Sequence, residues 1–109
     1  MNKRFSLVLI KPSHYDDDGY VIQWFRSAIP SNTLATLYGL ARDCADRRVL
    51  GPDTDLVITA FDETNTRIRV ASIIRRIKRA GAGLVALVGV QTNQFPRAVD
   101  IARPLRAAG

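Results

Sequence analysis

The segment Gly83-Leu-Val-Ala-Leu-Val-Gly-Val-Gln-Thr-Asn-Gln-Phe-Pro96 decides the fold of this chain. An apolar run over residues 84–90 stops at a polar stretch, and a proline then opens a helical pattern. Such a run is typical of a parallel strand that helices cover on both faces. The loop after it lies at the carboxyl end of the strand, where open α/β sheets bind ligands. The segment therefore predicts a parallel sheet and the edge of that sheet where a site should lie.

The length and cysteine content limit the class of protein. The 109 residues suffice for one domain or part of one, and 47% of them are apolar, enough for a core. Cys44 is the only cysteine, which excludes an internal disulfide and an all-cysteine metal or iron–sulfur site within these residues. We expect a cytoplasmic protein. The apolar run near the N-terminus is too short for a signal peptide or a membrane span and predicts a first strand.

The formal charge of +6 makes nucleic acid a partner to consider. The basic residues gather over 67–79 and 97–106, both of which have helical patterns. Aromatic residues do not alternate with them, as a base-stacking surface requires. We therefore expect solvated helix faces, with no membrane partner and no nucleic-acid partner. The alternative is a basic interaction module that binds RNA or an acidic protein through the second helix.

Hydrophobic periodicity predicts the order βαβαβα. Strands are expected over residues 5–11, 56–61 and 84–90, and helices are expected to open at Pro30-Ser31, at Thr64 or Thr66, and at Pro96. This alternation predicts a parallel sheet with right-handed crossovers, in a flavodoxin-like or Rossmann-like three-layer sandwich. Three strands are few for this architecture, so we expect a truncation before a fourth strand. The exposed sheet edges suggest a dimer.

The three loops that follow the strands should meet at one rim of the sheet. Gly89 allows a ligand to approach the third strand closely. The polar side chains after it can bond a ligand's amides or phosphate without carrying charge; they are Gln91, Thr92, Asn93 and Gln94. The alternative is that Asn93 or Gln94 only caps the third helix.

Other polar residues of these loops give weaker signals. His14, the only histidine, suits a metal ligand, an acid–base group or an axial ligand, but a solitary loop histidine is more often solvated. The carboxylates of residues 16–18 are consecutive and do not converge as a calcium loop requires. Asp62 with Glu63 could accept a ribose hydroxyl, but the glycine-rich turn of a dinucleotide site is missing after the first strand.

Three longer strings together resemble the N-terminal cobalamin (B12)-binding domain of radical S-adenosylmethionine proteins. They are Gly89-Val-Gln-Thr-Asn-Gln-Phe-Pro-Arg-Ala-Val-Asp-Ile-Ala102, Ile10-Lys-Pro-Ser-His-Tyr-Asp-Asp-Asp-Gly-Tyr20 and Ile29-Pro-Ser-Asn-Thr-Leu-Ala35. The resemblance covers essentially the whole chain, residues 1–109. It implies a flavodoxin-like domain that holds the corrin ring at the carboxyl rim. A [4Fe-4S] cluster and S-adenosylmethionine would belong to a downstream barrel with a CxxxCxxC motif, so this chain alone is not expected to catalyse radical chemistry.

The resemblance also implies which residues contact cobalamin. They are Pro12, Ser13, His14, Asp62, Gly89, Gln91, Thr92, Asn93 and Gln94. Cobalamin-dependent mutases place Asp-x-His-x-x-Gly after the first strand, but here Pro12 replaces the Asp and Asp17 the Gly. We therefore expect that His14 is not the cobalt ligand and that residues 91–95 lie beneath the ring. Strands four and five would house the nucleotide tail, so we expect weak or no cobalamin binding by these residues alone.

A flavodoxin-like signalling domain is the remaining alternative. A receiver domain requires an acidic cluster at the end of its first strand, where Lys11-Pro12 lies in this chain. It also requires an aspartate that accepts phosphate at the end of the third strand, and none is present there. The sequence therefore gives this alternative little support.

Overall fold

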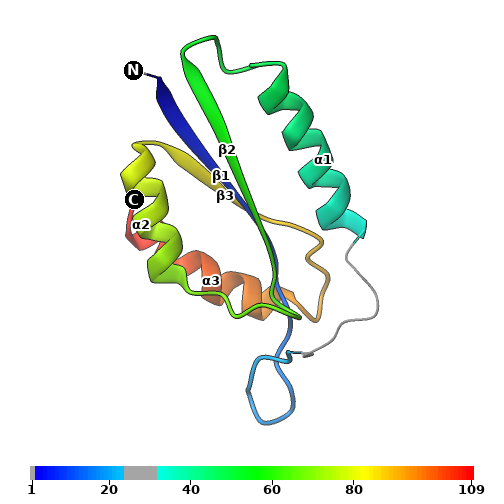
Figure 1. Cartoon of the computed structure of the whole chain (residues 1–109). Coiled ribbons are helices and arrows are strands. Elements are labelled where there is room, and N and C mark those ends of the chain that lie inside the picture. The colour runs from blue at the N-terminus through cyan, green and yellow to red at the C-terminus, as the bar shows by residue number, and fades with distance from the viewer. Residues whose placement is uncertain (1, 24–31) are drawn as a thin grey trace.

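The computed structural model describes residues 2–23 and 32–109 (Figure 1). Strands and helices alternate strictly along the chain, which confirms the expected βαβαβα order. The elements are β1 (Lys3–Lys11), α1 (Asn32–Asp46), β2 (Thr54–Asp62), α2 (Val70–Ala80), β3 (Gly83–Leu87) and α3 (Phe95–Ala107). Residues 30 and 31, which were expected to open α1, lie outside the described residues.

The three strands form one parallel sheet in the order β2-β1-β3. Strand β1 pairs with β2 from Lys3↔Thr54 to Lys11↔Asp62, and with β3 from Ser6↔Gly83 to Ile10↔Leu87. The parallel α/β sandwich predicted from sequence is therefore confirmed. Within it, β1 is the central strand, and β2 and β3 form the two edges.

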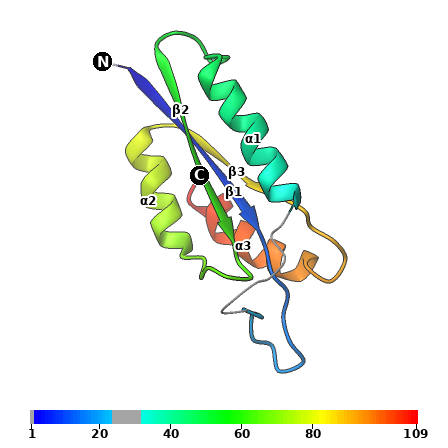
Figure 2. The same cartoon turned by 45° about the vertical axis from the view of Figure 1, so that its right-hand side comes forward.

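The helices lie in two layers on opposite faces of the sheet (Figures 1 and 2). Helix α1 covers β1 and β2 on one face, and α2 and α3 cover the other. The main core lies under α2 and α3, where Val8 and Ile10 of β1 pack with Ile68, Ile73 and Ile101. Burial of each such isoleucine stabilises the fold by about 1.5–3 kcal/mol. The α1 layer is thinner, because Ala41 is the only residue of α1 that is fully buried.

Strand β3 differs from the expectation for residues 84–90. It ends at Leu87 and lies at an edge of the sheet, where Leu84 stays 56% exposed. The Val88 amide still donates to the Ile10 carbonyl oxygen (2.8 Å). The strand cannot continue through Gly89, whose φ of +62° is left-handed. The apolar composition of residues 84–90 predicts a strand, but it does not show whether that strand lies in the centre or at an edge of the sheet.

Helix α2 begins later than predicted. Its N-cap residue is Arg69, and no side chain caps it, so the expectation of a cap at Thr64 or Thr66 was wrong. The Thr64 amide and hydroxyl both donate to Asp62 Oδ1 (3.0 and 2.6 Å), so that Thr64 closes a turn right after β2. The expected end at Gly81 is confirmed: this residue has φ 96°, and its amide donates to the Ile77 carbonyl oxygen.

Helix α3 carries a proline at each end. Pro96 lies in the first turn, where the missing N–H costs no hydrogen bond. Pro104 lies inside the helix but does not end it, because the helix continues to Ala107 and the Ala108 amide donates to the Pro104 carbonyl oxygen.

Candidate functional site

The loops after the three strands meet at one end of the sheet, which we call the carboxyl rim: residues 12–23, 62–69 and 88–94. The register that pairs Lys11 with Asp62 and Ile10 with Leu87 brings these loops together, as the sequence predicted. The loop after β1 reaches α3, because the Tyr15 hydroxyl donates to Asp100, and the loop after β3 runs directly into α3. In the strand order β2-β1-β3, the connection from β1 to β2 and the connection from β2 to β3 run across the sheet in opposite directions. The topological switch point therefore lies between β1 and β3, where such sheets usually bind ligands.

A buried ion pair braces the rim from below. The Glu63 carboxylate is 1% exposed and accepts bidentate hydrogen bonds from Arg97 of α3, at 3.0 and 3.1 Å from Nε and 2.7 Å from Nη2. The Ser13 amide donates to the same carboxylate (3.1 Å). The hydrogen bonds from Arg97 to Glu63 raise the pKa of Arg97 above its ordinary value, so it remains a cation. The pair therefore ties the loops after β1 and β2 to α3.

Tyr15 extends this network to the surface. Arg97 Nη1 donates to the Tyr15 hydroxyl (3.4 Å), and the guanidinium lies 5.8 Å from the centre of the Tyr15 ring. The hydroxyl donates in turn to Asp100 of α3. Burial, and then the hydrogen bond to Asp100, raise the pKa of Tyr15 above its ordinary value. The sequence placed Tyr15 and Glu63 in the loops of the rim, with Glu63 beside Asp62 as a possible acceptor for a ribose hydroxyl, but it did not predict the pair with Arg97 or the bond to Asp100.

Two of the predicted cofactor contacts, Pro12 and Ser13, are fully buried. Ser13 Oγ donates to the Ile22 carbonyl oxygen (2.5 Å), and the Ser13 amide is engaged with Glu63. Both residues thus form the floor of the rim. A ligand at the rim would contact the exposed loop residues around them and would not reach Pro12 or Ser13 directly.

His14 is half-buried beside this floor. Its carbonyl oxygen accepts a hydrogen bond from the Ile22 amide (2.9 Å). Its ring has no hydrogen-bond partner among residues 2–23 and 32–109. Nearby, the Asp16 carboxylate accepts the amides of Asp18 and Tyr20, which employs it in closing the turn over residues 16–20.

The carboxyl rim also contains Lys11 at the end of β1, a residue that the sequence did not predict as part of the site. Burial lowers the pKa of Lys11, and the nearby Asp62 carboxylate opposes that effect. The side chain of Lys11 runs past Gly89: a Cβ atom on that glycine would lie 3.0 Å from both Cδ and Cε of the lysine. The absence of a Cβ at Gly89 therefore allows the Lys11 side chain to lie against the backbone just after β3. Asp62, which was predicted to contact the cofactor, is half-buried. Its Oδ1 atom accepts hydrogen bonds from the Thr64 amide and hydroxyl.

The loop after β3 presents polar groups to solvent. Gln91, Thr92 and Asn93 are exposed, and Gln94 is half-buried. Gln94 Oε1 accepts the Gln91 amide (2.8 Å), so its side chain closes this loop. No side chain caps α3, and the alternative of a cap by Asn93 or Gln94 was therefore wrong. In the described part of the chain, the side chains of Thr92 and Asn93 have no partner and can bond a ligand.

No three side chains among His, Cys, Asp and Glu gather as a metal site in the described residues. Cys44 lies half-buried in α1. None of the helices in that part of the chain is long and apolar enough to cross a membrane.

Comparisons with protein-family models, with curated proteins and with solved structures found no match to this chain.

Proposed function

We propose that this chain is a cobalamin-binding module that holds the corrin ring over the carboxyl rim of its sheet. The observation that carries the proposal is the strand order β2-β1-β3, which puts the topological switch point between β1 and β3. The loop between β3 and α3 carries uncharged hydrogen-bonding side chains at this end of the sheet. The resemblance of the three sequence strings to B12-binding domains gives the ligand its identity.

The residues at the rim fit such a ligand. Gly89 has no Cβ, so the Lys11 side chain lies against its backbone, and a ligand can approach the same backbone closely. Gln91, Thr92 and Asn93 are exposed, and they can pair with the amide side chains at the edge of a corrin without the cost of burying charge. The Glu63–Arg97 pair would hold the floor of the rim in one conformation, which lowers the entropy lost on binding.

His14 would not coordinate cobalt in this arrangement. A ligating imidazole is normally oriented by a second hydrogen bond from its other ring nitrogen. The His14 ring has no such partner in the described residues, and Asp17 stands where the mutase motif has Gly. We expect His14→Ala to leave the visible spectrum of bound cobalamin unchanged. A spectral change on this substitution would contradict this assignment.

Bound cobalamin would supply a cobalt centre for radical or group-transfer chemistry, while the chain would supply binding and orientation. The [4Fe-4S] cluster and S-adenosylmethionine implied by the resemblance would be held by other residues, because a cluster needs several cysteine ligands and this chain has only Cys44. We place the module in the cytoplasm. Proteins of that compartment rarely form disulfides, and a chain with one cysteine cannot form an internal one.

Binding is tested by titrating the chain with hydroxocobalamin, using the visible spectrum and equilibrium dialysis. We expect saturable but weak binding that Gly89→Ala reduces by about tenfold, because a Cβ there would displace the Lys11 side chain at the rim and strain a left-handed residue. Gly51→Ala is the matched control: Gly51 also has a positive φ, but it precedes β2 at the opposite end of the sheet, and its Cβ would meet nothing within 4 Å.

Two outcomes would contradict the proposal. One is the absence of saturable hydroxocobalamin uptake by the chain without substitutions. The other is an equal loss of uptake in the Gly89→Ala and Gly51→Ala variants, because that result would trace the loss to general backbone strain.

A further inference from the structure

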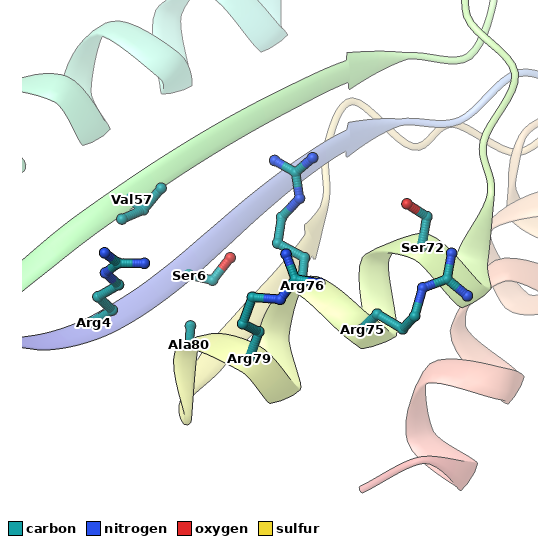
Figure 3. A pocket seen from close by; sticks show the side chains of 8 residues that line it. All are labelled: Arg4, Ser6, Val57, Ser72, Arg75, Arg76, Arg79 and Ala80. Carbon is teal, nitrogen blue, oxygen red and sulfur yellow. The ribbon is translucent and has the colours of Figure 1, made fainter.

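A groove on the α2 face of the sheet gathers arginines from two elements (Figure 3). It has a volume of about 310 Å³ and lies between α2 and the strands β1 and β2. Ser6 and Val57 line it from the strands and face Arg76 and Arg79 of α2, while Arg4 lies at one end and Arg75 with Ser72 at the other (Figure 3). The groove is separate from the carboxyl rim proposed for cobalamin.

The positive charge of this groove is uncompensated. No acidic residue lines it, and Arg4, Arg75, Arg76 and Arg79 form no ion pair in the described part of the chain. Several other arginines do find carboxylates, among them Arg42, Arg48 and Arg97. Like charges held together repel, and the arrangement is relieved by a bound anion. Helix α2 alone does not explain the cluster, because Arg4 comes from β1.

Arg76 is held in place over the sheet. Its Nη1 atom donates to Thr59 Oγ1 of β2 (2.7 Å), so one guanidinium nitrogen is fixed while the others remain free to bind a ligand. A planar guanidinium with several donors suits the oxygens of a phosphate group better than an ammonium does.

The floor of the groove contains an unsatisfied hydroxyl. Ser6 is 1% exposed, and its Oγ has no hydrogen-bond partner among the described residues. An unmade hydrogen bond at a buried polar group costs about 1–3 kcal/mol. An oxyanion in the groove, or a water that the oxyanion holds in place, would accept a hydrogen bond from the Ser6 hydroxyl and remove that cost. The cationic walls and the unsatisfied donor therefore point to the same kind of ligand.

We propose that this groove binds the phosphate group of a small phosphorylated molecule, held by Arg4, Arg76 and Arg79 above the Ser6 hydroxyl. The residues that line it include no aromatic side chain on which a base could stack, which favours a compact phosphate over single-stranded nucleic acid. Val57 provides an apolar wall against which the carbon part of such a molecule can pack.

The test follows the amide resonances of the full chain by NMR at fixed physiological ionic strength. The probes are inorganic phosphate, glycerol phosphate and a single-stranded oligonucleotide. We expect saturable shifts at Ser6, Val57 and Arg76 with both small phosphates, and no tighter binding of the oligonucleotide per phosphate. Binding of the oligonucleotide alone would overturn the proposal in favour of a nucleic-acid surface.

Three variants locate the site. Arg76→Gln with Arg79→Gln should weaken phosphate binding by about tenfold, because two charge-assisted contacts are lost. The control is Arg42→Gln with Arg47→Gln, which removes the same charge from α1 and the turn directly after it, on the other face of the sheet. Ser6→Ala should weaken binding without lowering the melting temperature, because it removes a buried group that has no partner. The proposal would be overturned if the control variant lost as much phosphate affinity as Arg76→Gln with Arg79→Gln, or if Ser6→Ala left the affinity unchanged. Either result would indicate a diffuse cationic surface without a defined phosphate site.

Discussion

At the scale of single residues, the Glu63–Arg97 pair is the contact on which the carboxyl rim most depends. We expect Glu63→Gln to lower the free energy of unfolding by about 2 kcal/mol or more, because Arg97 keeps its charge and loses a buried carboxylate. Urea denaturation measures this change. The control is Asp43→Asn, which breaks an exposed pair with Arg47 and should cost at most about 0.5 kcal/mol. Equal losses in the two variants would contradict the bracing role of Glu63.

Lys11 provides a second test at the residue scale. Burial lowers its pKa from the ordinary 10.5, and the Asp62 carboxylate partly restores it. We therefore expect the Lys11 pKa, measured from its side-chain carbon shifts by NMR, to lie below the ordinary value and to fall further in Asp62→Asn. A Lys11 pKa that rises in this variant would show that the two groups do not interact as described.

The same shift has a consequence for stability at alkaline pH. The folded chain releases the Lys11 proton at a lower pH than the unfolded chain does, so the unfolded state binds more protons over that interval. This group therefore increases the free energy of unfolding as the pH rises from its lowered pKa toward 10.5. Tyr15, whose pKa is raised, lowers the free energy of unfolding as the pH rises above 10. NMR titration of each side chain in the folded chain therefore has to separate the two contributions.

The sequence predicted some of these residues and missed others for a physical reason. Gln91, Thr92 and Asn93 were predicted because they follow a strand directly, and they are exposed at the rim. Arg97 was missed because its partner Glu63 lies 34 positions away, and only the tertiary fold brings them together. Pro12 and Ser13 were predicted as contacts from position alone, which does not reveal that the loop buries them.

At the scale of elements, the packing of β3 against β1 and α2 depends on Gly83. A Cβ on this residue would lie 2.6 Å from the Ser6 carbonyl oxygen and 2.8 Å from an Ile77 methyl carbon. We expect Gly83→Ala to lower the free energy of unfolding by about 1–3 kcal/mol, because backbone atoms of β1 must move. Thermal or urea denaturation measures the loss.

Gly39→Ala is the matched control in a helix. A Cβ at Gly39 would meet nothing within 4 Å, and alanine favours helix over glycine by about 1 kcal/mol, so this variant should be more stable than the parent. If both variants shift stability in the same direction, the proposed close contact at the start of β3 is wrong.

Element types were readable from sequence, whereas several boundaries were not. Periodicity identified all three strands and all three helices, because each buries an apolar face. The start of α2 was misplaced, since Thr64 bonds to the Asp62 side chain and delays the helix to Val70. The end of β3 was misplaced because the backbone conformation of Gly89 cannot be read from its neighbours.

At the scale of the whole molecule, the alternation of elements was enough to predict the parallel sheet, since right-handed crossovers leave few other arrangements. The strand order was not predicted, and it decides that β1 is central and that the topological switch point lies between β1 and β3. Association through the two exposed edges stays a prediction, which the dependence of the sedimentation coefficient on concentration can test.

The most direct test of the central claim is a map of the amide resonances that hydroxocobalamin perturbs across the full chain. We predict saturable shifts confined to the carboxyl rim, with the largest at Gly89, Thr92 and Asn93, and little change at Ser6 and Arg76 in the arginine-lined groove. Saturable shifts that cluster away from the rim, or the absence of any saturable shift there, would contradict the account.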